Sequence, residues 1–189
     1  VGDMVAAVAA TDSTIAEEAV RLIEVDYDEL PVVYTVERAV PDNAALLQEK
    51  LDNRKDPGYG RGGKHIVHDR SNICFHFRHE RGDIEHGFQD SDQIFEDSFY
   101  FPSAQHYPME PHVCVAQFEG DVLTVWSATQ SPFAVRQELA RVFGLPFSAV
   151  RVIVPHVGGG YGAKSGIKTE GIAACLSRMI GRPVKLAFG

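Results

Sequence analysis

Residues 152–165 read Val-Ile-Val-Pro-His-Val-Gly-Gly-Gly-Tyr-Gly-Ala-Lys-Ser, an apolar strand-like run that leads into four glycines within five positions. Glycine is costly to order in a loop, because it loses more chain entropy on folding than any other residue. A cluster of glycines therefore indicates backbone torsions, or a close approach to a ligand, that a Cβ atom would block. The stretch predicts a loop that binds a ligand through its main chain.

A helix is predicted to start close behind this loop. Between Thr169 and Ile180 the apolar residues recur three and four positions apart, which is typical of an amphipathic helix. A strand, a glycine loop and a helix in this order can form a cradle for an anion or a cofactor, because free N–H groups and the helix dipole both favour negative charge.

A dinucleotide-binding motif overlaps the loop and fits it poorly. Gly158, Gly160 and Ala163 match the pattern G-x-G-x-x-A. About twenty residues later, where an acidic partner for the ribose is expected, the chain has Pro183 and Lys185. The motif alone is therefore weak support for a nucleotide site.

A phosphate-binding loop of the type G-x-x-x-x-G-K-[ST] is the second alternative. Lys164 and Ser165 are in place, but Ala163 stands where the second glycine belongs. A nucleotide-phosphate-binding protein stays an alternative function, as does a non-catalytic scaffold or interaction module.

Hydrophobic periodicity along the chain predicts an α+β fold with mixed sheets and packed helices. Helices are expected after a capping box formed by Thr14 and Glu17, after Ser131, where Pro132 takes the first helical position, and from Thr169. The predicted strands are 4–10, 23–27, 73–78, 113–118, 122–126, 150–154 and 184–188.

The composition excludes several classes of protein. A net charge of −8 over 189 residues disfavours nucleic acid and anionic membranes as partners, because both require a basic surface. No apolar run reaches the roughly 20 residues that cross a bilayer, so we expect a protein without a membrane span. The odd number of cysteines, without a C-x-x-C pair, fits a reducing compartment, and we expect a cytoplasmic protein. Cys74, Cys114 and Cys175 are far apart, which argues against a disulfide framework, a zinc site or an iron–sulfur cluster within this chain.

Histidines are abundant but do not predict a metal site. Neither of two groups matches a zinc-binding spacing, and transition metals require convergent geometry rather than abundance. The spacings therefore give no support for a metal site in either group. The first group is His65, His68, His76, His79 and His86, and the second is His106, Glu110 and His112.

Four motifs follow one another along the chain: Gln105 to Pro111, Ala128-Thr129-Gln130, the Gly-Gly-Gly-Tyr-Gly-Ala-Lys loop at 158–164, and Gly181-Arg182-Pro183-Val184. This order resembles the molybdenum-binding large subunit of the xanthine dehydrogenase and aldehyde oxidase family. The first residues, up to Pro31, resemble the end of that family's α/β-hammerhead domain. The resemblance implies three segments. They are the C-terminal part of a hammerhead domain at 1–40, a connector at 41–92 and the N-terminal part of a molybdopterin-binding domain at 93–189.

The resemblance implies a fragment of a molybdenum hydroxylase, which oxidises an aldehyde or an N-heterocycle with oxygen derived from water. Its cofactor would be molybdopterin with molybdenum, in the plain or the cytosine dinucleotide form. The implied cofactor-binding residues are Gly159, Gly160, Tyr161 and Gly162, with Tyr161 in place of the family's usual Phe. The implied partners are the remainder of the large subunit, an iron–sulfur subunit or domain, FAD in another segment, and a small-molecule substrate.

Two side chains carry the chemistry that the resemblance implies. In the family, the glutamine of the Ala-Thr-Gln triplet hydrogen-bonds an oxygen ligand of molybdenum, which makes Gln130 the predicted catalytic residue. A capping role for the following helix is the alternative for Gln130. Ser165 is the substrate-pocket candidate, and it disfavours purines because purine-oxidising members have an acidic residue there. The family's general base is a Glu far downstream, outside this chain, so we expect the isolated 189 residues to be inactive.

Overall fold

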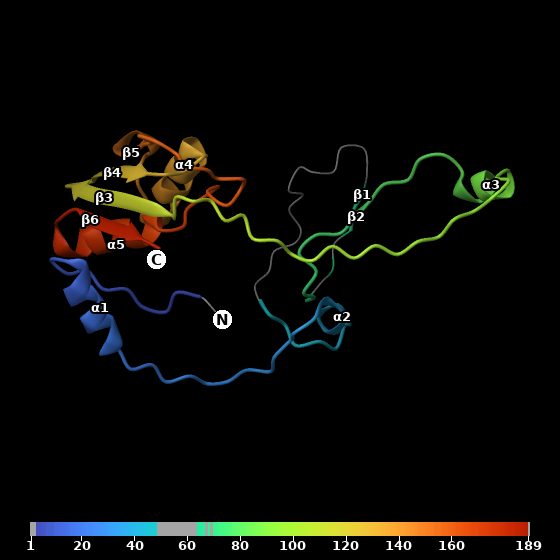
Figure 1. The fold of residues 1–189 in the computed structure, drawn as a ribbon, viewed down its shortest axis with the longest axis horizontal. Helices are drawn as coiled ribbons and strands as arrows, with labels where there is room; N and C mark the ends of the chain where they lie inside the picture. Colours follow the sequence, from blue (N-terminus) through green and yellow to red (C-terminus); the bar gives the residue numbers. More distant parts are fainter. Residues whose placement is uncertain (1–2, 49–63, 67, 69, 189) are drawn as a thin grey trace. The chain divides into compact units, whose positions relative to one another are not determined.

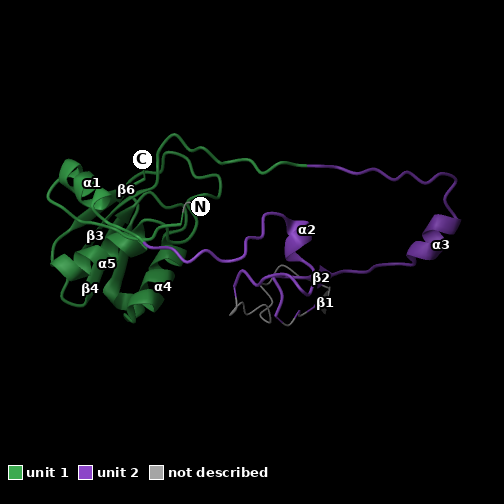
Figure 2. Ribbon diagram, turned by 90° about the horizontal axis from the view of Figure 1, so that it is seen from below, with its two compact units in different colours: residues 1–25, 101–189 green, residues 26–100 purple. Residues whose placement is uncertain are grey.

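The structure, a computed structural model, describes residues 3–48, 64–66, 68 and 70–188 (Figure 1). The chain divides into two compact units (Figure 2). Unit 1 comprises residues 1–25 and 101–189, and unit 2 comprises residues 26–100.

The centre of unit 1 is a four-stranded mixed sheet in the order β5-β4-β3-β6. β3 (Val113–Glu119) and β4 (Val122–Ser127) form the predicted antiparallel hairpin. β5 (Val150–Ile153) runs parallel to β4, and β6 (Val184–Ala187) runs antiparallel to β3. The predicted strands at 113–118, 122–126, 150–154 and 184–188 are thus confirmed, with small differences at their ends.

Helix α4 (Pro132–Phe143) connects β4 to its parallel neighbour β5, a connection that requires a crossover. Pro132 fits the first helical position, because its fixed φ is helical and its missing N–H is not needed there. The side chain of Ser131 makes no capping hydrogen bond, so the helix starts without the cap expected of that residue. Gly144 ends the helix in the left-handed conformation, with φ of 64°. A short 3-10 helix, η1 (Phe147–Ala149), follows.

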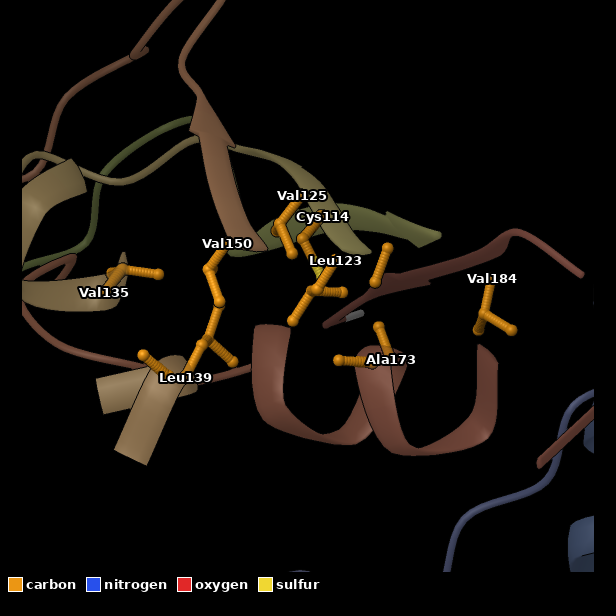
Figure 3. Close-up of a cluster of buried hydrophobic side chains, with 11 residues drawn as sticks. Cys114, Leu123, Val125, Val135, Leu139, Val150, Ala173 and Val184 are labelled. Atoms are coloured by element: carbon orange, nitrogen blue, oxygen red, sulfur yellow. The ribbon is translucent and has the colours of Figure 1, made fainter. Parts of the chain in front are cut away.

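Helix α5 (Glu170–Ile180) follows the glycine loop, as predicted, and ends at Gly181 with φ of 65°. Together with α4 it covers one face of the sheet, where the apolar side chains of helices and strands form a single core (Figure 3). The strand register places alternate residues on this face, so that Ala116 lies opposite Val125 and Cys114 opposite Ser127. The buried core residues are Cys114, Ala116, Leu123, Val125, Val135, Leu139, Ala140, Val150, Ala173, Ala174 and Val184.

The N-terminal part of unit 1 differs from the prediction. Helix α1 (Ser13–Arg21) is capped by Asp12, whose side chain accepts the N–H of Ile15 at 3.0 Å, so the predicted capping box is wrong. The strands predicted at 4–10 and 23–27 are also wrong, because the described residues in these ranges are not in strands. A strand needs a partner strand to satisfy its N–H and C=O groups, and neither segment pairs with one in the described part of the chain.

Unit 2 contains short elements: helices α2 (Val36–Ala39) and α3 (Ile84–Gln89), and an antiparallel pair of two-residue strands, β1 (Lys64–His65) and β2 (Phe77–Arg78). The strand predicted at 73–78 is therefore reduced to its last two residues. Among the residues of unit 2 whose exposure is described, 26–48, 66, 68 and 70–100, none is buried. Most of the glycine-rich part of the predicted connector, at 49–63, lies outside the described residues.

Candidate functional site

Two motifs meet because β4 and β5 are parallel neighbours, whose carboxyl ends lie at the same edge of the sheet. The Ala128-Thr129-Gln130 triplet follows β4, and the glycine loop follows β5. The main-chain N–H of Gln130 donates to the carbonyl oxygen of Lys164 at 3.1 Å, and the Thr129 hydroxyl donates to the same oxygen at 3.0 Å. Gln130 Oε1 accepts the N–H of Gly162 at 3.0 Å.

The third motif, Gln105 to Pro111, contacts the loop through Glu110. Glu110 Oε2 accepts the Lys164 ammonium at 2.6 Å and the Gly158 N–H at 2.7 Å. The hydrogen bond from Lys164 is the main reason that the pKa of Glu110 lies below its usual value, and the Gly158 N–H contributes next. Lys164 is 2% exposed, so its charge is buried against this carboxylate.

Two histidines of the predicted second group lie at the same loop without forming a metal site. His112 Nε2 is 3.1 Å from the carbonyl oxygen of Ala163. His106 lies beside Gly162, where an added Cβ atom would be 3.6 Å from His106 Nε2. In the described part of the chain, no group of three His, Cys, Asp or Glu residues could hold a metal ion. Nor is any described helix long and apolar enough to cross a membrane.

The backbone of the loop adopts conformations that side chains disfavour. Gly159 and Gly162 have φ of 89° and 96°, which glycine adopts without a steric cost. Tyr161 has φ of 51°, in the left-handed region where a bulky residue is uncommon. Such strain persists only where the surroundings over-determine the conformation, and it clusters at functional sites. The Tyr161 side chain is 76% exposed, so its own packing does not explain the strain.

Three main-chain donors of the loop are free. The N–H groups of Gly158 and Gly162 are used by Glu110 and Gln130. Those of Gly159, Gly160 and Tyr161 have no hydrogen-bond partner among the described residues.

Gly160 is the informative member of these three. It is buried, and a buried N–H without a partner is rare in folded proteins. A Cβ at Gly160 would lie 2.4 Å from Gln130 Oε1, so glycine is required for Gln130 to keep its place. The site thus offers unpaired donors in a backbone cradle, as a bound anionic group would require.

The start of α5 contributes less than the sequence indicated. The carboxylate of Glu170, in the first turn, accepts the Ser127 hydroxyl at 2.5 Å and the Lys168 N–H at 2.7 Å. This buried carboxylate supplies the negative charge that the helix N-terminus favours. Burial also raises the pKa of the neighbouring Cys114 thiol to about 11, so the thiol is neutral at physiological pH. The protein itself therefore already places a negative charge at the start of α5.

The structure argues against both nucleotide-binding alternatives. A phosphate loop needs its lysine free to reach phosphate groups, whereas the ammonium of Lys164 is buried against Glu110. A dinucleotide fold has a doubly wound parallel sheet, whereas here, within the four-stranded sheet, only β4 and β5 are parallel.

The predicted site residues are brought together, with one exception. Gln130 and the residues predicted to bind the cofactor, Gly159, Gly160, Tyr161 and Gly162, form one cluster at the edge of the sheet. Ser165, the substrate-pocket candidate, is exposed and makes no hydrogen bond to them among the described residues. The sequence prediction did not include the ion pair between Glu110 and Lys164. The sequence did offer one indication of a contact, because Glu110 and Lys164 each lie in one of the four motifs that carry the family resemblance.

Comparison with known proteins identifies the family of the chain. The family of molybdopterin cofactor-binding domains matches residues 67–188. A probable xanthine dehydrogenase component of Bacillus subtilis (strain 168) is 36% identical over 187 residues, which covers 98% of this chain and 22% of that protein. The probable hypoxanthine oxidase XdhD of Escherichia coli (strain K12) is 33% identical over 205 residues, covering 100% of this chain and 21% of that protein.

A solved structure extends the similarity to the fold. Quinoline 2-oxidoreductase from Pseudomonas putida 86 matches with a TM-score of 0.68 and 31% sequence identity, covering 95% of this chain and 21% of that chain. The present chain spans about a fifth of the length of these relatives.

Proposed function

Because the chain belongs to the molybdopterin cofactor-binding domain family of xanthine dehydrogenase-type large subunits, we propose that its glycine loop and Gln130 form part of a molybdopterin site. The whole protein would be a molybdenum hydroxylase that oxidises an aldehyde or an N-heterocycle. Residues 1–40 would then end a hammerhead domain, and residues 93–189 would begin the molybdopterin-binding domain, with the connector between them.

The observation that carries the proposal is the unpaired, buried N–H of Gly160, with the free N–H groups of Gly159 and Tyr161 beside it. Three adjacent main-chain donors can bind a phosphate or a carbonyl acceptor of a pterin cofactor without a side-chain charge. The positive φ of Gly159 and Tyr161 is what turns consecutive N–H groups away from regular pairing.

Gln130 would act as a hydrogen-bond donor toward the bound cofactor. Its Oε1 already accepts the Gly162 N–H, and only an oxygen can accept that bond. The amide therefore presents its Nε2 group, with two N–H donors, to the cofactor. When bound, the molybdenum cofactor supplies a two-electron acceptor and the water-derived oxygen that hydroxylation requires. An uncharged donor such as the Gln130 amide can stabilise developing negative charge without introducing a full positive charge.

The remaining parts of the enzyme are proposed from the family. The general base, the rest of the pocket and the binding of the cofactor in its plain or cytosine dinucleotide form would come from the remainder of the large subunit. Iron–sulfur clusters and FAD would lie in other segments or subunits. Two matched relatives are named for hypoxanthine and xanthine, and a third for quinoline. With Ser165 in place of an acidic residue, we propose a substrate other than a purine.

The test uses the full-length protein that contains these residues, purified from cells grown with molybdate. We expect about one molybdenum and one released pterin per chain, measured by metal analysis and pterin fluorescence. Aldehydes, non-purine N-heterocycles and purines would then be compared as substrates, with Ser165→Glu as the variant that supplies the missing acid. Bound nucleotide without molybdenum would contradict the cofactor proposal, and efficient purine oxidation by the unchanged protein would contradict the role of Ser165.

A further inference from the structure

Lys164 joins two motifs through two different groups of the same residue. Its ammonium binds Glu110, which belongs to the tract at 105–111. Its carbonyl oxygen accepts the Gln130 N–H and the Thr129 hydroxyl, which belong to the triplet after β4. The side chain is 1% exposed, so Lys164 cannot touch a ligand with its charge in this arrangement.

Glu110 holds both ends of the glycine loop with one oxygen atom. Oε2 accepts the Gly158 N–H at the first residue of the loop and the Lys164 ammonium at the last. In addition, the Glu110 N–H donates to the Gly158 carbonyl oxygen at 3.4 Å. Gly158 has no room for a side chain, because a Cβ there would lie 2.6 Å from the Cβ of Glu110. The two residues thus close the loop 158–164 as a clasp.

The clasp fixes the part of the loop that carries the free donors. Between its ends, the Ala163 N–H donates to the Gly160 carbonyl oxygen at 2.8 Å. The Gly162 N–H meets Gln130 Oε1, and this bond determines which end of the Gln130 amide faces outward. A shift of Lys164 would therefore disturb Gln130 in two ways. It would move the carbonyl oxygen that accepts the Gln130 N–H, and it would move the loop whose Gly162 N–H binds Gln130 Oε1.

We propose that Lys164 and Glu110 are a positioning pair, which sets the shape of loop 158–164 and the orientation of the Gln130 amide without contacting the cofactor. This inference rests on the proposed function. A buried ion pair is weak support for stability, because the desolvation of both charges offsets their attraction. Its fixed geometry, with two further bonds to main-chain groups of the loop, is what favours a positioning role.

The experiment compares Glu110→Leu, Lys164→Met and the double variant in the full-length protein, with Lys168→Met as the control. Lys168 is an exposed lysine four residues along the same segment. Three quantities are measured: molybdenum and pterin per chain, the thermal midpoint, and the molybdenum(V) electron paramagnetic resonance spectrum of the loaded fraction. Mutation of a residue that holds a binding residue in place typically lowers affinity or activity by roughly 10–100-fold. We expect a loss of that size in cofactor retention, and a shifted spectrum, for both single variants and not for Lys168→Met.

The double variant separates positioning from stability. Replacing both charges by apolar side chains removes the buried unpaired charge that either single variant leaves, so the double variant is expected to regain thermal stability. A positioning pair predicts that its cofactor retention and spectrum stay altered. Recovery of all three quantities in the double variant would show that the pair is only structural and would overturn the inference. Normal cofactor retention and an unchanged spectrum in a well-loaded Lys164→Met protein would also overturn the inference. Absence of molybdenum from the protein without substitutions would instead overturn the proposed function itself.

Discussion

The segment at 101–189 of unit 1 and the whole of unit 2 show how differently one chain uses its apolar residues. In the former, alternate strand residues and two helical stripes enclose a core whose centre is fully buried. In unit 2 no residue with a described exposure is buried, and Phe95, Phe99 and Tyr100 are all more than four-fifths exposed. The site lies entirely on the former segment. A strained Tyr161 and a buried Lys164 can persist there because a packed core supports the loop that carries them.

The largest effect is expected from removing a core side chain of unit 1, and an exposed apolar side chain of unit 2 serves as the comparison. Leu139 is 0% exposed in α4, so Leu139→Ala should lower the free energy of unfolding by about 2–5 kcal/mol through lost burial and a cavity. Leu47 in unit 2 is 61% exposed, and Leu47→Ala should change the free energy of unfolding by no more than about 0.5 kcal/mol. Denaturant unfolding of both variants gives the two values. Equal losses would mean that Leu47 packs in the protein as firmly as Leu139 does.

Gln130→Ala tests the catalytic assignment with a control from the other unit. Loss of one preorganised donor costs on the order of 3 kcal/mol in the transition state, a decrease in kcat of roughly 100- to 1,000-fold. Molybdenum content should stay near that of the unchanged protein. Gln89→Ala, at the end of α3 in unit 2, is the matched control and should leave kcat unchanged. If kcat survives in Gln130→Ala, the residue has only the role of a polar group at the start of α4.

Gly160→Ala asks whether the loop binds the cofactor directly or through Gln130. The added methyl group would collide with Gln130 Oε1, so we expect cofactor load and turnover to fall on the order of 100-fold, as for a misplacement of about 1 Å. Gly87→Ala, in α3, places its methyl group in open space and should change neither. In the double variant Gly160→Ala/Gln130→Ala the collision is absent. Recovered cofactor load there means that Gly160 acts through Gln130, and continued loss means that the methyl group obstructs the cofactor itself.

The same contrast explains which features the sequence could predict. The hairpin, α4, β5, α5 and β6 follow from periodicity because their partners lie in the same packed segment. The strands expected at 4–10 and 23–27 had equally clear patterns, but a pattern does not supply the partner strand that a sheet requires. The boundaries of the three implied domains, at 40 and 92, stay predictions.

The sequence predicted which residues form the candidate site, but it did not predict the hydrogen bonds and the ion pair between them. The family resemblance placed Gln130 and the loop in one site, and the structure brings them together because residues that follow parallel neighbouring strands meet at one edge of the sheet. The bond of Gly162 to Gln130 joins residues 32 apart in sequence, and the ion pair of Lys164 with Glu110 joins residues 54 apart. No local pattern specifies such contacts. The glycine cluster also suggested free amides throughout the loop, whereas those of Gly158 and Gly162 bind Glu110 and Gln130.

The smallest effect concerns the pH dependence of stability, and again each unit provides one residue. The pKa of Glu110 is lowered in the folded chain, chiefly by its hydrogen bond with Lys164. In unit 2 the pKa of Glu37 is lowered by its own main-chain N–H at the start of α2, and then by Thr35. A carboxyl group with a lowered pKa takes up a proton more readily when unfolded. Its stabilising contribution is therefore complete above its unfolded value, near 4.5, and is lost as the pH falls from there through the folded pKa.

Thermal midpoints of the full-length protein between about pH 3 and pH 6 would measure both contributions. Glu110→Gln should flatten the acid side of the curve, because the variant has no carboxyl group whose protonation breaks the bond to Lys164. Glu37→Gln should flatten it less, since Glu37 is exposed to solvent and its interactions are screened by water. Both variants should match the unchanged protein in slope above about pH 6, where both carboxyl groups are ionised in the folded and the unfolded chain. A different result is possible: the curve for Glu110→Gln could run parallel to that of the unchanged protein throughout the acid range. That result would mean that folding does not lower the pKa of Glu110, and that its hydrogen bonds in the loop do not favour the ionised carboxylate.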